Sequence, residues 1–171
     1  TKGFRDVLEI GRQTRPHLYN YRVKRPEPLI PRHLRLEVNE RMMADGAVRV
    51  ALDEAELRLA AEKLRDEKVE AIVICFLHSY RNPSHEKRAR EIVLSVLPDV
   101  YVSISSSILP EFREFERLST TVLNAYMGPR MDRYLERLIG RVHDIGIDAN
   151  LDTVHSNGGL MSVPTVKEMP V

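Results

Sequence analysis

The sequence predicts an α/β fold, in which a mixed sheet combines strand–helix–strand units with a β-hairpin. An apolar run from Val69 to Leu77 is typical of a strand that is buried on both faces. An amphipathic helical pattern follows over residues 85–97, and apolar residues then alternate with others over residues 100–104. Because strand, helix and strand follow one another, we expect a parallel pair with a right-handed crossover.

The first 33 residues are expected to form a connecting helix and a linker, separate from an α/β domain over residues 34–171. Phe4 to Ile10 has a short helical pattern that Gly11 closes. Six prolines and tyrosines then lie within residues 15–32. Because proline fixes φ and removes a hydrogen-bond donor, this stretch is predicted to be an extended connector.

A β-hairpin and a capped helix are predicted next. Leu34, Leu36 and Val38 alternate with polar residues, which indicates a half-exposed strand, and a second alternating segment begins at Val48. The Asp-Gly pair within residues 44–46 is a turn signal between them.

Two helix starts carry capping residues. Asp53 precedes a helical stripe and has Glu56 three positions later, which is the spacing of a capping box. Ser84 follows Asn82-Pro83 and is expected to cap the second helix.

The C-terminal third is predicted to be mainly helical. A helix is expected from Glu114 to His143, kinked or divided at Gly128-Pro129. A strand over residues 151–154 then leads into the glycine turn of residues 156–159.

Composition excludes several classes of function. The 26 basic and 25 acidic residues nearly cancel, so charge gives no reason to expect nucleic-acid or membrane binding. No apolar stretch approaches the roughly 18 to 20 residues that span a bilayer. The one cysteine, Cys75, excludes an internal disulfide and favours a reducing, cytoplasmic setting.

His78 is the first candidate site residue. It follows the buried strand, and the carboxyl ends of strands face the ligand crevice of open α/β sheets. The imidazole is suited to act as a general base or a metal ligand. The alternative is a histidine that only hydrogen-bonds a neighbouring loop.

A charged segment over residues 110–117 supplies the other candidate catalytic residues: Glu111, Arg113, Glu114 and Arg117. Arg113 and Arg117 are four positions apart and are suited to hold an anionic group together. Residues at such spacing also form ordinary ion pairs on a solvated helix face, and that alternative stays open.

Two further segments are candidates for binding substrate or phosphate. Asn124 lies in a run of hydroxyl and amide residues, where bonding within the helix is an equal explanation. Ser156, Asn157, Gly158 and Gly159 follow a predicted strand, where glycines can open backbone donors toward an anion, although a plain turn explains the same residues. Because the histidines share no clear helix face, no metal site is predicted within these residues.

Five segments occur in order along nearly the whole chain: residues 1–13, 75–86, 110–117, 120–126 and 156–161. Together they resemble the hydantoinase A/5-oxoprolinase family. That family includes ATP-hydrolysing N-methylhydantoinase, ATP-dependent 5-oxoprolinase, and subunits of acetone and acetophenone carboxylases.

The resemblance implies an ATP-dependent enzyme that hydrolyses the ring amide of a small hydantoin-like or oxoproline-like substrate. It also implies an actin/sugar-kinase-like ATPase fold, Mg²⁺ with ATP, and a hydantoinase B-type partner subunit or domain. In that setting His78 is expected to relay a proton, and Arg113 or Arg117 to steady a carboxylate or phosphorylated intermediate.

The sequence departs from the family in extent. The family's nucleotide loops of the Asp-x-Gly-Gly-Thr type do not occur in it, nor does the Gly-Pro-Ala-Gly-Gly stretch. Phosphoryl transfer depends on positioned phosphates and metal, so this chain is expected to be an internal fragment that neither binds nor hydrolyses ATP alone. Two alternatives stay open: a carboxylase subunit segment, and a non-catalytic scaffold whose charged loop docks the partner.

Overall fold

The computed structural model describes residues 1–14, 17–23, 26–154 and 158–171. In chain order the elements are α1 (Val7–Ile10), the 3-10 helix η1 (Arg32–Leu34), β1 (Arg41–Met42), β2 (Val48–Val50), α2 (Glu54–Asp66), β3 (Ala71–Ile74), α3 (Ser84–Val96), β4 (Tyr101–Ile104), α4 (Ser105–Ile108), α5 (Glu114–Asp144), β5 (Asp152–Val154), β6 (Leu160–Ser162) and α6 (Val163–Glu168). The α/β class is confirmed.

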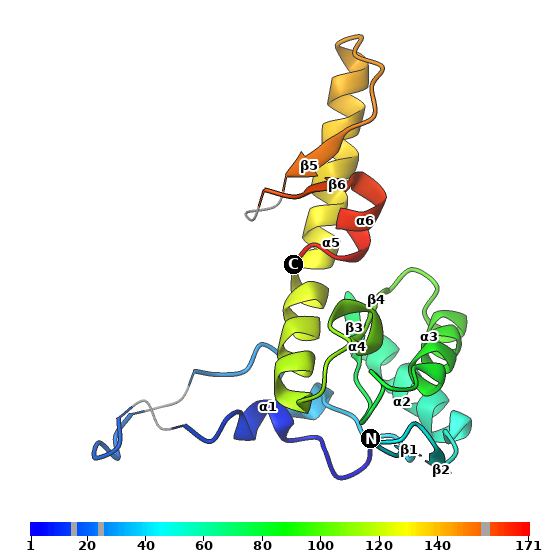
Figure 1. The fold of residues 1–171 in the computed structure, drawn as a ribbon. Coiled ribbons are helices and arrows are strands. Elements are labelled where there is room, and N and C mark those ends of the chain that lie inside the picture. The colour runs from blue at the N-terminus through cyan, green and yellow to red at the C-terminus, as the bar shows by residue number, and fades with distance from the viewer. Residues whose placement is uncertain (15–16, 24–25, 155–157) are drawn as a thin grey trace.

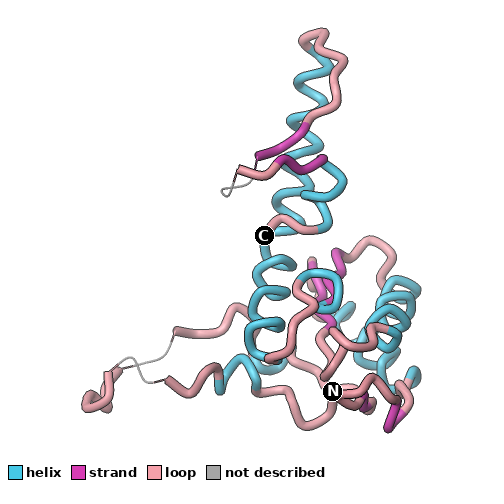
Figure 2. Tube along the Cα trace, viewed as in Figure 1, coloured by secondary structure: helices cyan, strands magenta, loops and turns pink. Residues whose placement is uncertain are grey.

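The strands form three two-stranded sheets within the described residues, so the expected single mixed sheet is wrong (Figure 2). β3 and β4 are parallel, and α3 connects them, which confirms the strand–helix–strand unit. β1 and β2 are antiparallel, which confirms a hairpin around the Asp-Gly turn, but its first strand is Arg41–Met42 rather than the predicted segment at Leu34 to Val38. β5 pairs antiparallel with β6.

The strand expected at Leu34, Leu36 and Val38 does not form. Leu34 ends η1, and residues 35–40 belong to no strand. The alternation has another cause, because all three apolar side chains line the same pocket beside β3. Packing on one face thus produced a strand-like pattern without a ladder partner.

The helix starts agree only partly with the sequence pattern. Glu56 N donates to Asp53 Oδ1 at 2.9 Å, which confirms the cap of α2. Ser84 is not the cap of α3: it is the first helical residue, and its own N–H donates to Asn82 Oδ1 at 3.1 Å.

The main core lies in the lower part of Figure 1, where α2, α3, β3 and β4 pack together. It includes Leu57 of α2, Ile72 and Ile74 of β3, and Ile92 of α3. A smaller core joins Leu135 of α5 to Val163 and Val166 of α6.

None of the helices in the described ranges combines the length and apolarity needed to cross a bilayer.

α5 connects the two cores as one helix of 31 residues with Pro129 inside it (Figure 1). Of the predicted kink or division at Pro129, the division is therefore wrong. Gly128 instead allows α5 to pack closely against a neighbouring aromatic ring. Gly128 lies against the ring of Tyr101, whose hydroxyl donates to the carbonyl oxygens of Lys167 and Glu168. A side chain at Gly128 would overlap that anchored ring.

We therefore expect Gly128→Ala to lower the free energy of unfolding by about 1 to 3 kcal/mol, the usual cost of overpacking. Gly140→Ala is the matched control, because nothing lies within 4 Å of its added methyl group. That control should stabilise the helix by up to about 1 kcal/mol, since alanine favours helix over glycine. Urea unfolding measures both, and equal effects would contradict the close contact.

Candidate functional site

The candidate site is built where β3 and β4 end. Since the strands are parallel, with Ile74 opposite Ile104, the segments that follow them leave the sheet at the same edge. One is the loop of residues 75–83, which contains His78, and the other spans residues 105–113. Ligands of open α/β sheets bind at this edge.

The Glu86 carboxylate links the two segments by accepting hydrogen bonds from both. It is fully buried on α3. Its Oε1 accepts from Phe76 N at 2.7 Å and from Ser105 Oγ at 2.6 Å, and its Oε2 accepts from Ser106 N at 2.8 Å. A buried carboxylate needs such donors, because an unpaired charge in the interior is very unfavourable.

Arg117 of α5 completes this network. Its side chain is buried, and Nε donates to Ser105 Oγ at 3.1 Å. Its terminal nitrogens donate to the carbonyl oxygens of Phe76 at 2.7 Å and Glu111 at 2.9 Å. Because these carbonyls lie in different loops, Arg117 holds the two loops together, and its guanidinium also lies over the Tyr80 ring.

The Ser105 hydroxyl is shared by three side chains of the network. When its hydroxyl donates to Glu86, its lone pairs are free to accept from Arg117 Nε and from Ser79 Oγ, which lies 3.1 Å away. The positive and negative charges are therefore linked through one hydroxyl. We call Ser79, Glu86, Ser105 and Arg117 the loop network.

Cys75 lies against the loop network. Burial, and then the negative charge of Glu86, raise the pKa of its thiol. A raised pKa keeps the thiol protonated at neutral pH, so Cys75 is unsuited to act as a nucleophile.

His78 lies in the loop of residues 75–83 with a left-handed backbone, φ 56°. Its carbonyl oxygen accepts from Arg81 N at 2.9 Å and Asn82 N at 3.2 Å, which closes the turn. The imidazole is partly exposed and meets the Tyr80 ring edge-on, with 6.0 Å between centroids. A left-handed backbone is uncommon for residues other than glycine, although histidine adopts it more readily than most.

The charged segment divides into a buried and an exposed part. Glu111, Arg113 and Glu114 are exposed, and Arg113 lies over the Phe112 ring at 5.3 Å. Arg117 points inward to the loop network instead. The structure therefore does not bring the two guanidinium groups together as a joint anion clamp.

The candidate binding residues lie apart from these loops. Asn124 is fully buried at the junction of α5, β4 and α6, where Nδ2 donates to Ser103 Oγ at 2.9 Å and Glu168 O at 3.1 Å. Its Oδ1 has no partner among the described atoms. Gly158 and Gly159 are exposed and precede β6, and Ser156 and Asn157 lie outside the described residues.

A second buried carboxylate, Glu40, lies beside β1. Its side chain is fully buried, and it accepts from the Thr1 hydroxyl and contacts His85 Nδ1 at 2.8 Å. This pair fixes the first residues of the chain to the start of α3.

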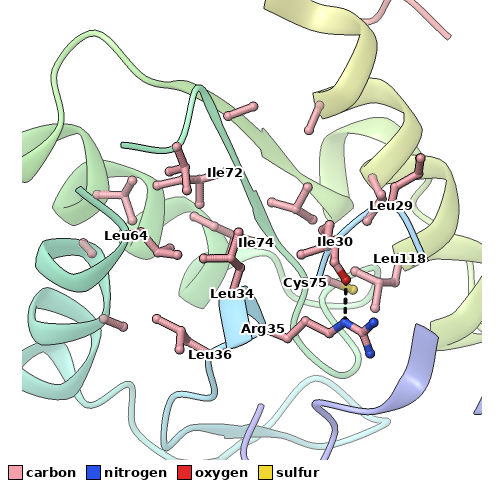
Figure 3. Close-up of a pocket in the computed structure, with 18 of the residues that line it drawn as sticks. Leu29, Ile30, Leu34, Arg35, Leu36, Leu64, Ile72, Ile74, Cys75 and Leu118 are labelled. Atoms are coloured by element: carbon pink, nitrogen blue, oxygen red, sulfur yellow. Dashed lines mark hydrogen bonds between the residues drawn. The ribbon is translucent and has the colours of Figure 1, made fainter. Parts of the chain in front are cut away.

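A pocket of about 600 Å³ lies beside β3 and is mainly apolar (Figure 3). His78, Glu111, Arg113 and Glu114 do not line it. It therefore belongs to the packing of the sheet rather than to the candidate chemistry.

Arg113 and Arg117 are the sequence-predicted donors for an anionic group such as the phosphates of ATP. Arg117 directs its donors to Ser105, Phe76 and Glu111, and Arg113 stacks on Phe112 at the surface. Among the described residues, no group of three or more His, Cys, Asp or Glu side chains is placed to hold a metal ion. Arg113 and Arg117 therefore do not form a shared phosphate cradle.

Sequence reasoning missed the roles of Glu86, Ser79 and Ser105. One signal was available for Glu86. It lies three positions before Ala89 and so on the same helix face as the apolar residues, where an acidic residue is out of place.

Comparison with known proteins places the chain in a family. Residues 1–97 match the hydantoinase/oxoprolinase N-terminal region, and residues 117–171 match the hydantoinase/oxoprolinase family. The chain belongs to the hydantoinase/oxoprolinase family.

Among its relatives, the caprolactamase subunit alpha of Pseudomonas jessenii is 39% identical over 173 residues, which cover 100% of this chain and 25% of that protein. The crystal structure of the ATP-dependent caprolactamase from Pseudomonas jessenii superimposes with a TM-score of 0.85 and 41% identity, covering 94% of this chain and 23% of that one. The nucleotide-free structure of acetone carboxylase gives a TM-score of 0.84 and 30% identity, covering 99% and 26%. The chain thus spans about a quarter of the length of these relatives.

We expect Glu86→Gln to lower the free energy of unfolding by about 1 to 3 kcal/mol, the cost of an unsatisfied buried group. The new amide must point its hydrogens at Phe76 N–H or Ser106 N–H, which are themselves donors. Glu91→Gln, on the exposed side of the same helix, removes only the surface pair with Arg88. That control should change stability by under about 1 kcal/mol. Chemical unfolding compares the two, and a neutral Glu86→Gln would contradict the role of the carboxylate.

Proposed function

We propose that this chain is part of an ATP-dependent amidohydrolase that opens the ring of a small cyclic amide. The observation that carries the proposal is the close similarity, over nearly the whole chain, to the ATP-dependent caprolactamase, whose name denotes a cyclic amide substrate. A hydantoin-like or oxoproline-like ring has the same reactive group, which is an amide carbonyl within a ring.

The geometry supports a role at the substrate for the loop that carries His78. The loop network holds this loop rigidly at the carboxyl edge of β3, while the imidazole itself stays partly exposed. A positioned imidazole can pass a proton between the attacking oxygen and the departing ring nitrogen. Support of a partly exposed polar side chain by buried hydrogen bonds is typical of functional positions.

ATP and Mg²⁺ belong to the whole protein in this proposal. The chain would contribute one part of an actin/sugar-kinase-like ATPase, with the phosphates held by other parts of the polypeptide. When bound, the nucleotide would supply phosphoryl activation of the amide oxygen. The donors of Arg117 are committed to the two loops of this chain, which agrees with that division.

A second candidate function is that of an acetone-type carboxylase subunit, supported by the fold similarity to acetone carboxylase. In both cases a partner is proposed, because the caprolactamase relative is itself a subunit. We propose a hydantoinase B-type subunit or domain. The exposed charged residues Glu111, Arg113 and Glu114 are the surface that would dock it in the scaffold alternative.

The decisive assay is ADP release by the whole protein with its partner subunit, in the presence of Mg²⁺ and ATP. We expect 5-oxoproline, hydantoin or caprolactam to stimulate ADP release and to yield the ring-opened acid. Stimulation only by a ketone with bicarbonate would instead establish the carboxylase. No stimulation by either class would contradict both functions.

His78→Asn in the whole protein tests the proton-relay role without a change in backbone strain, since asparagine tolerates left-handed φ. We expect kcat for ADP release to fall by about 10² to 10⁴, the usual contribution of a general acid or base. Gln13→Asn is the control, because Gln13 has φ 57° and is exposed. It should leave turnover unchanged.

His78→Gly removes the imidazole at a position where glycine is unstrained and should reproduce the loss. Unchanged turnover in both His78 variants would exclude the imidazole from the chemistry. Loss of the complex on size-exclusion chromatography would favour the scaffold alternative.

A further inference from the structure

Within the described residues, the His78 imidazole makes an aromatic contact but no hydrogen bond. The hydrogen bonds of His78 are those that its carbonyl oxygen accepts from Arg81 N and Asn82 N. Its ring meets the Tyr80 ring edge-on, with 6.0 Å between the ring centroids and 66° between the ring planes. Aromatic rings favour this arrangement when their centroids lie roughly 4.5 to 7 Å apart. The direction of the imidazole therefore depends on where the Tyr80 ring lies.

The Tyr80 ring is held in turn by the guanidinium group of Arg117. The central carbon of that group lies 5.6 Å from the ring centroid, within the range of a cation–π contact. Arg117 is only 1% exposed. A cation that is shielded from water attracts an aromatic ring more strongly than a hydrated one. The Tyr80 ring is thus anchored on a buried cation and touches the partly exposed imidazole.

Neither the cation nor the backbone between the two rings is free to move independently. Arg117 donates hydrogen bonds to Ser105 Oγ and to the carbonyl oxygens of Phe76 and Glu111. Ser79, which separates His78 from Tyr80 in the chain, is buried, and its Oγ lies 3.1 Å from Ser105 Oγ. The loop network therefore fixes the Tyr80 ring from below through Arg117 and fixes its backbone through Ser79.

We propose that Tyr80 is the positioning residue of the proton relay, and that its ring, held by Arg117, sets the direction in which the His78 imidazole faces the substrate. The inference rests on the proposed function, because it concerns the step assigned to His78. Tyr80 itself neither transfers the proton nor contacts the reacting atoms. Without the ring, the imidazole would turn about its side-chain bonds, and misplacement of a reacting group by about 1 Å can slow turnover by about a hundredfold.

The contacts of Tyr80 also predict which substitutions it tolerates. Both the contact with Arg117 and the contact with His78 are made by its ring. Phenylalanine keeps that ring, whereas leucine removes it. Methionine fills similar space without an aromatic ring, so Tyr80→Met serves as a second variant if Tyr80→Leu does not fold and assemble.

The first test is amide-stimulated ADP release by the whole protein with its partner subunit. We expect Tyr80→Leu to lower kcat by about 10- to 100-fold. The KM for the cyclic amide should stay within about twofold, because Tyr80 does not bind the substrate. Tyr80→Phe should restore kcat to within about twofold of the unaltered protein. Tyr134→Leu is the matched control, since Tyr134 is exposed on α5 and should leave turnover unchanged.

A double-mutant cycle with His78→Asn then tests whether Tyr80 acts through the imidazole. If it does, Tyr80→Leu has little further effect once the imidazole is gone, so the two losses do not multiply. Size-exclusion chromatography with the partner subunit checks that each variant assembles. A merely structural role of Tyr80 would slow both backgrounds by the same factor.

Equal losses with and without the imidazole would therefore overturn the proposal. So would normal turnover of Tyr80→Leu and Tyr80→Met beside a slow His78→Asn, which would leave the proton relay intact. If His78→Asn alone keeps full turnover, the relay itself fails and the positioning role falls with it. That single variant separates a failure of the proposed function from a failure of this inference.

Discussion

Hydrogen bonding to the buried Glu86 carboxylate is the interaction on which the carboxyl edge of β3 and β4 depends. A charge in the interior is tolerated only when donors surround it, and here the donors come from Phe76, Ser105 and Ser106. Removal of the charge therefore affects two loops at once. Arg117 reaches the same loops from the opposite side, so both are fixed between α3 and α5.

The buried stripe at the start of α5 is adapted to this task. Arg117, Thr121, Asn124 and Gly128 follow one another at helical spacing and are all buried, yet none is a large apolar residue. Each meets a polar or bulky group, such as Ser103 beside Asn124 and the Tyr101 ring beside Gly128. Arg117 and Asn124 thus join the helix to the sheet region through polar contacts, whereas Thr121 bonds within the helix and Gly128 allows a close approach. Satisfied buried polar contacts specify one arrangement of the packed elements.

Elements with local causes could be predicted from the sequence, and contacts between distant residues could not. The Asp53 cap, the hairpin turn and the strand–helix–strand order depend on neighbours within a few positions, and the structure confirms them. The strand at Leu34 to Val38 was wrong because one-sided packing imitates strand alternation.

For the candidate site too, positions set by local sequence could be predicted, whereas contacts between distant residues could not. The position of His78 at the end of β3 follows from local pattern. The bonds that Glu86 and Arg117 make join residues as far as 41 positions apart, and no spacing rule shows them. Likewise, Arg113 and Arg117 share a spacing that suits an anion clamp, but burial of one and exposure of the other separate them.

The most direct measurement is a crystal structure of the whole protein with a bound cyclic amide and a non-hydrolysable ATP analogue. If the loop on β3 serves the chemistry, the ring amide should lie within hydrogen-bond reach of the His78 imidazole, about 3 Å or one water away. The phosphates should lie on parts of the protein outside residues 1–171. A substrate bound far from His78, with that loop covered by the partner subunit, would contradict the catalytic role and establish the loop as a docking surface.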